Sequence, residues 1–117
     1  MKYMMLIYFD EKTLTESTRE HCYEESHRLI EDISTKRQYL ASAPLHGTST
    51  ATSVRIREGK TLVTDGPFAE TREQLGGYYL VDVDNLDEAI KIAERIPGAR
   101  FGTIEVRPVI ELAKPCP

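Results

Sequence analysis

The sequence predicts one α+β domain built from short strands and two helices. With 117 residues, the chain is long enough for a single hydrophobic core and too short for two, so we expect residues 1–117 to form one domain. Apolar residues recur with the period of a strand in several short runs, and two longer runs have the period of a helix. Their order is strand, helix, hairpin, strand, helix, strand, which is a ferredoxin-like βαββαβ-type pattern with an added hairpin.

Residues 2–9 and 16–42 predict the first strand and the first helix. The strand is apolar on both alternating sets of positions, so we expect it at the centre of the sheet with both faces covered. The second stretch contains no Gly or Pro and places Leu29 and Ile33 at helical spacing among charged residues. It predicts one long amphipathic helix that ends before Pro44.

Residues 50–63 predict a hairpin, because Val54 alternates with Arg55 and a Gly-containing turn follows. The polar stretch that comes next begins with the turn signal Asp65-Gly66-Pro67 and ends with Gly76-Gly77. Gly-Gly at the start of a strand indicates the close approach of another backbone or of a ligand. A connection of this length exceeds what two strands need, so it indicates a ligand-facing loop.

The remaining elements follow in order. Residues 77–83 are again apolar on both faces and predict a strand. Residues 84–98 predict the second helix, with Asn85 and Glu88 at capping-box spacing and a Pro-Gly pair at its end. Residues 101–109 predict the last strand.

The two helices can cover only one face of the predicted sheet, although two of its strands are apolar on both faces. An exposed apolar sheet face is larger than the patch that a monomer usually tolerates. A second copy that packs sheet to sheet is the simplest cover, so we expect a homodimer.

Composition excludes several classes of function. The net charge is −4 and Lys and Arg are scattered, so we expect no nucleic-acid partner. No apolar run approaches the roughly 18 residues of a membrane span, and the first residues lack the features of a signal peptide, so we expect a cytoplasmic protein without a membrane partner. Cys22 and Cys116 have no metal-binding spacing and are expected to be free thiols. We expect no metal site. No motif in the sequence indicates that a particular cofactor is bound.

Several polar residues are candidates for a ligand site. Asp65 either caps its turn or acts as a base or as the partner of a histidine. If their faces point into a dimer interior, Arg55, Arg107 and Tyr78 can hold a carboxylate or phenolate ligand. The alternative for the two arginines is a cross-strand ion pair with Glu105 and its neighbours.

Three motifs resemble the YCII-related proteins that carry the DGPF signature. They are D-G-P-F-A-E-T at 65–71, E-Q-L-G-G-Y-Y at 73–79 and E-V-R-P-V at 105–109, in this order. The resemblance implies that the ferredoxin-like subunit pairs as a dimeric α+β barrel. It implies no single reaction, because members are mostly uncharacterised. Some are encoded beside extracytoplasmic-function sigma factors, so a sigma factor as partner follows from the resemblance alone.

The wider superfamily is similar to muconolactone-type isomerases and includes a dehalogenase, and a His-Asp pair has been proposed as its active site. Transferred to this sequence, the pair is His27 and Asp65, with His46 as the alternative histidine.

We therefore expect a dimer that binds a small molecule in a cleft lined by the DGPF loop. The alternative is an isomerase or lyase that uses His27 and Asp65 as acid and base on a small carboxylated or phenolic compound. A purely structural dimer is the third hypothesis, and it leaves the polar stretch without an explanation.

Overall fold

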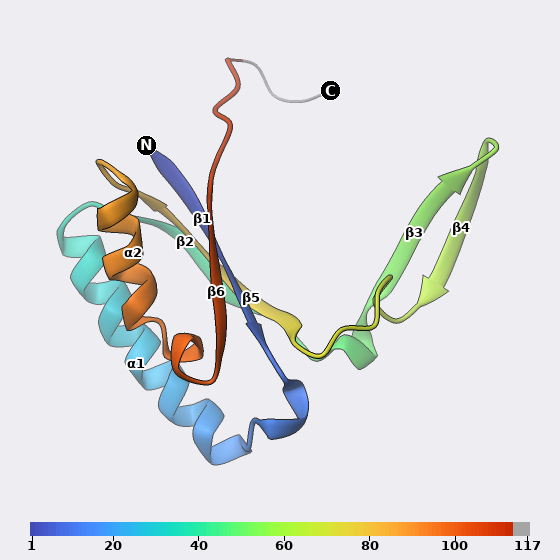
Figure 1. The fold of residues 1–117 in the computed structure, drawn as a ribbon, viewed down its shortest axis with the longest axis horizontal. Helices are drawn as coiled ribbons and strands as arrows, with labels where there is room; N and C mark the ends of the chain where they lie inside the picture. The colour runs from blue at the N-terminus through green and yellow to red at the C-terminus, as the bar shows by residue number, and fades with distance from the viewer. Residues whose placement is uncertain (114–117) are drawn as a thin grey trace.

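The computed structural model describes residues 1–113, and these residues form an α+β fold (Figure 1). In chain order the elements are β1 (Lys2–Phe9), α1 (Glu16–Thr35), β2 (Tyr39–Pro44), β3 (Thr52–Arg57), β4 (Lys60–Asp65), β5 (Gln74–Asp82), α2 (Leu86–Arg95) and β6 (Gly102–Pro108).

The main sheet has the strand order β2-β5-β1-β6, and each neighbouring pair is antiparallel. Both helices lie on one side of this sheet (Figure 1). The predicted ferredoxin-like α+β fold is therefore confirmed, and β1 holds the predicted central place between β5 and β6.

The predicted helix over 16–42 is wrong at its C-terminal end. α1 ends at Thr35, because Arg37 adopts a left-handed conformation with φ of 59°. The backbone N–H groups of Arg37 and Gln38 then donate to the carbonyls of Ser34 (3.0 Å) and Ile33 (2.8 Å). This is a Schellman ending with arginine in the place that glycine usually takes, so the sequence gives no stop signal there. The chain continues directly into β2, an edge strand of the sheet that the sequence pattern did not predict.

The hairpin of β3 and β4 is confirmed, and it forms a separate two-stranded sheet. Glu58 and Gly59 both have positive φ, as a tight hairpin turn requires. The hairpin extends from the side of the main sheet that the helices leave open (Figure 1). Its apolar face holds Val54, Ile56 and Val63, which are 62%, 66% and 64% exposed.

The turn predicted at Gly66 lies at the base of this hairpin. Gly66 has φ of +95°, which is the left-handed conformation that favours glycine. Its N–H donates to the carbonyl of Ala51 (2.7 Å), and its own carbonyl accepts from the Ser53 hydroxyl (2.8 Å). The turn therefore joins β4 to the start of β3.

The hydrophobic core lies between the main sheet and the two helices. From the sheet, Met5 and Val81 are fully buried, and from α1, Leu29 and Ile33 are buried against them. Alternate positions on the central strands point to the open face of the sheet and are only half-buried in the single chain; they include Met4, Leu6, Tyr78 and Leu80.

The second helix begins at the predicted cap. The Asn85 side-chain oxygen accepts a hydrogen bond from the N–H of Glu88 (3.0 Å), and the helix ends before Pro97, as predicted. Within residues 1–113, neither helix is both long and apolar enough to span a lipid bilayer.

Gly102 tests the packing of β6 against β1. A side chain at this position would overlap the backbone oxygen of Tyr8, which the sheet holds in place. We expect Gly102→Ala to lower the free energy of unfolding by about 1 to 3 kcal/mol, as overpacking does. Urea unfolding measures the change, and Gly47→Ala is the control, because a Cβ there meets its nearest atom at 3.7 Å. Equal stability of Gly102→Ala and the unmodified chain would contradict this packing.

Candidate functional site

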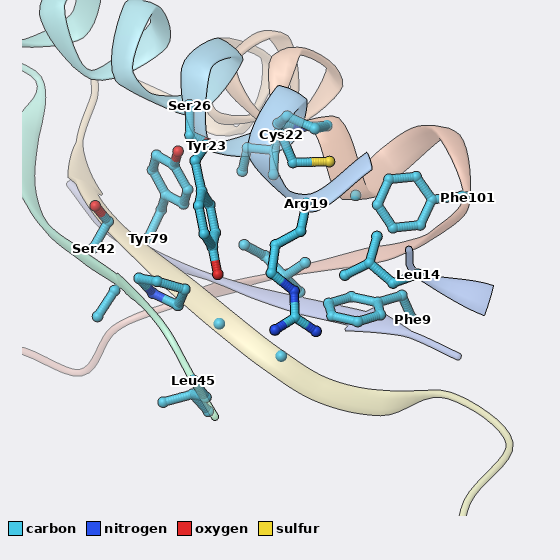
Figure 2. A pocket seen from close by; sticks show the side chains of 18 of the residues that line it. Phe9, Leu14, Arg19, Cys22, Tyr23, Ser26, Ser42, Leu45, Tyr79 and Phe101 are labelled. Carbon is cyan, nitrogen blue, oxygen red and sulfur yellow. The ribbon is translucent and has the colours of Figure 1, made fainter. Parts of the chain in front are cut away.

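An open cavity of about 140 Å³ lies between the N-terminal half of α1 and strands β1, β2 and β5 (Figure 2). We call it the α1 pocket. α1 contributes Arg19, Cys22, Tyr23, Ser26 and Ile30 to its wall. These residues are three or four positions apart, so they share one face of the helix.

The floor of the α1 pocket depends on two glycines of β5. A Cβ on Gly77 would lie 2.9 Å from the carbonyl oxygen of Ala43, and one on Gly76 would overlap the ring of Phe9. The sequence prediction that another backbone approaches closely is confirmed at Gly77, whereas Gly76 makes room for a side chain. Both glycines line the pocket, so the missing side chains also leave room for it.

Apolar residues form part of the mouth of the α1 pocket. Phe9 and Phe101 contact each other edge to face, with ring centroids 5.8 Å apart. The connection after β2, which carries the lining residue Leu45, is fixed by a carboxylate. Glu11 accepts hydrogen bonds from the N–H and the hydroxyl of Thr48, both at 2.8 Å. This contact ties the connection between β1 and α1, which carries the lining residue Leu14, to the connection between β2 and β3, and so holds two sides of the mouth together.

Two ionisable side chains of the α1 pocket stay protonated at neutral pH. Burial, together with the nearby carboxylate of Glu25, raises the pKa of the Cys22 thiol. Burial also raises the pKa of the Tyr79 hydroxyl, and its interaction with the Ser26 hydroxyl offsets only part of this effect. Both groups are therefore neutral hydrogen-bonding groups and not anions.

The lining of the α1 pocket contains no Asp, Glu or His within the described chain, and Arg19 is its only residue with a charge at neutral pH. In residues 1–113 no group of three or more His, Cys, Asp or Glu side chains is placed to hold a metal ion. The α1 pocket can bind an apolar ring. Its hydroxyl groups and its one cation can then interact with substituents on that ring.

His27 and Asp65 are not brought together within one chain. His27 is on the solvent side of α1, with its side chain 75% exposed and its Nε2 3.1 Å from the Glu31 carboxylate. Asp65 is the last residue of β4, at the base of the hairpin, and no described residue donates a hydrogen bond to its carboxylate. The pairing stays a prediction, because a second copy could still supply one partner.

The other predicted site residues also lie outside the α1 pocket. Tyr78 and Arg107 share the open face of the main sheet. Arg107 pairs with Glu105 two residues earlier on its own strand, and not across strands as the alternative for this residue had it. Arg55 is exposed on the hairpin, and His46 is exposed in the connection after β2. Their role as ligand-binding residues stays a prediction.

The DGPF segment lies where the hairpin returns to the main sheet, and it contributes no residue to the α1 pocket as described. A cleft lined by this loop stays a prediction that concerns the open side of the sheet. The sequence interpretation did not include the α1 pocket, because its walls come from segments that are far apart in the chain. The spacing of Arg19, Cys22, Tyr23 and Ser26 was a signal that could have found it.

This chain is similar to a family model, to a protein of related sequence and to a solved structure. A family model described as the YCII-related domain matches residues 1–113. An uncharacterized protein of Rhizobium meliloti (strain 1021) is 40% identical over 124 residues, which is 98% of this chain and 96% of the relative.

Among solved structures, the 5-chloro-2-hydroxyhydroquinone dehydrochlorinase of Burkholderia phenoliruptrix AC1100, in complex with 2,5-dihydroxybenzoquinone, is similar with a TM-score of 0.59. The match covers 94% of each chain at 13% sequence identity, so it shows a shared fold and not a shared reaction.

The raised pKa of Cys22 predicts a slowly reacting thiol. In a Cys116→Ser variant, whose substitution lies outside the described residues, Cys22 is the remaining cysteine. We expect the pH midpoint of its alkylation by iodoacetamide to lie above that of the same chain unfolded in urea, because the thiolate is the reactive form. A folded midpoint at or below the unfolded one would show that the thiol is not disfavoured by burial.

Proposed function

This chain belongs to the YCII-related family, and we propose that it is a small-molecule-binding protein whose α1 pocket takes a compound with a single ring. The observation that carries the proposal is a preformed, mainly apolar pocket that lacks a group suited to proton transfer near neutral pH. Pockets for small ligands are typically concave and apolar with a few placed polar groups.

The size of the α1 pocket limits its ligand. Its volume of about 140 Å³ is close to that of an engineered protein cavity of about 150 Å³ that binds benzene. A single ring therefore fits this space. The aromatic side chains of Phe9, Tyr23 and Phe101 offer edges and faces on which such a ring can pack.

A second candidate function is an isomerase or lyase on a carboxylated or phenolic ring compound. It is favoured by the fold shared with a dehydrochlorinase whose bound compound is a single dihydroxylated ring. The general base of such an isomerase or lyase would have to come from outside the α1 pocket. The candidates are His46 and the pair His27 and Asp65. Loss of the ring compound on incubation, and not binding alone, distinguishes this function.

We also propose that the protein is a homodimer. The open face of the main sheet carries half-buried apolar residues, and the hairpin, which carries exposed apolar residues, extends from that side of the sheet (Figure 1). A two-stranded hairpin is marginally stable in isolation, so it is expected to pack against something. A second copy covers both surfaces at once. A cytoplasmic location and a sigma-factor partner stay predictions from the sequence.

A panel of single-ring compounds tests the binding function by thermal unfolding. A compound present at about 100 times its Kd stabilises the fold by about 2.7 kcal/mol, if it binds only the folded chain. We expect Ser26→Leu to abolish this stabilisation, because the larger side chain fills the α1 pocket. Ser34→Leu is the matched control on the exposed face of α1 and should retain it. The proposal fails if no ring compound stabilises the protein, or if Ser26→Leu retains the full effect.

Leu80 tests the dimer. Leu80→Glu would place an unpaired charge in the proposed interface, so we expect it to dissociate the dimer at micromolar concentration in sedimentation velocity. Leu86→Glu makes the same change on the exposed start of α2 and should leave the dimer intact. A folded monomer for the unmodified chain, or an unchanged dimer for Leu80→Glu, would contradict the proposal.

A further inference from the structure

Arg19 is the charged residue at the mouth of the α1 pocket. Figure 2 shows the guanidinium of Arg19 reaching across the opening, between the ring of Tyr23 and the side chains of Phe9 and Leu14. Within residues 1–113 no carboxylate lies within 4 Å of this guanidinium, although Arg95, Arg100 and Arg107 each have such a partner.

The rest of the lining does not neutralise this cation. The Cys22 thiol and the Tyr79 hydroxyl stay protonated at neutral pH, and the other lining side chains are apolar or carry neutral hydroxyls. Arg19 is exposed at the mouth, so solvent and salt screen part of its attraction for an anion. The planar guanidinium matches a carboxylate, which it can bind through two parallel N–H donors.

Hydroxyl groups gather at the other end of the α1 pocket. Ser42 and Tyr79 lie at the end away from Arg19 in Figure 2, and the Ser42 hydroxyl shares a hydrogen bond of 2.9 Å with Tyr39. An apolar ring between the two ends would therefore meet a cation on one side and neutral hydrogen-bonding groups on the other.

We propose that Arg19 makes the α1 pocket selective for ring carboxylates, with the carboxylate on Arg19 and a hydroxyl or carbonyl on the opposite ring carbon directed to Ser42 and Tyr79. This assignment rests on the proposed binding function and names the class of its ligand. The sequence suggested Arg55 and Arg107 as the residues that bind a carboxylate. The proposal gives this role to Arg19, which lines a pocket.

The test compares 4-hydroxybenzoate with 4-hydroxybenzamide, which has nearly the same shape and no charge. Isothermal titration calorimetry on the full chain should give a Kd at least tenfold lower for the carboxylate. Arg19→Gln should remove this preference, and Arg19→Lys should keep part of it, since lysine retains the charge without the fork of donors. Because the mouth is open to solvent, added salt should also weaken the preference.

Arg28→Gln is the matched control, because Arg28 is exposed on the same helix and does not line the α1 pocket. It should keep the full preference for the carboxylate. Equal binding of the two compounds by the unmodified chain, or an unchanged preference in Arg19→Gln, would overturn the role of Arg19. If both compounds bind equally and Ser26→Leu blocks both, the binding function stands and only the selectivity is wrong. If neither compound binds and no other ring compound does, the binding function itself is wrong.

Discussion

The central strand β1 is the constraint on which the rest of the structure depends. It is hydrogen-bonded to β5 on one edge and to β6 on the other, so its register fixes both halves of the main sheet. A shift of one residue would exchange its two faces and expose the fully buried Met5. The end of the same strand supplies Ile7 and Phe9 to the α1 pocket. The fold and the candidate site are therefore positioned by one strand.

The α1 pocket exists because the inward face of α1 changes along its length. In the C-terminal half, Leu29 and Ile33 fill the space against the sheet and are buried. In the N-terminal half the same face carries Cys22 and Ser26, whose short side chains fill less of the space beneath the helix. A well-packed interior leaves few voids larger than a water molecule. The α1 pocket lies where the inward-facing side chains of α1 become shorter, so the sequence of α1 accounts for the cavity.

Residue periodicity predicted most of the fold, because strands and helices with one buried face repeat their apolar residues regularly. It failed at β2, where the end of α1 depends on Arg37 in a conformation that glycine usually adopts, and no residue type marks the stop. The α1 pocket was not predicted, because a pocket depends on how α1 and β5 meet in space. Neither Cys22 nor Tyr79 differs in sequence from an ordinary core residue, and the raised pKa of each comes from that packing.

The two sides of the main sheet have separable roles. The α1 pocket opens on the helix side, whereas Tyr78, Arg107 and the hairpin with Asp65 belong to the open side. A second copy on the open side would cover the residues that the family resemblance emphasises and would leave the α1 pocket accessible. Residues of the DGPF segment would then be available for contacts between copies or for a site shared by them, since none of them lines the α1 pocket. The proposed ligand site in the α1 pocket is lined by none of these residues, so its contacts would come from a single chain.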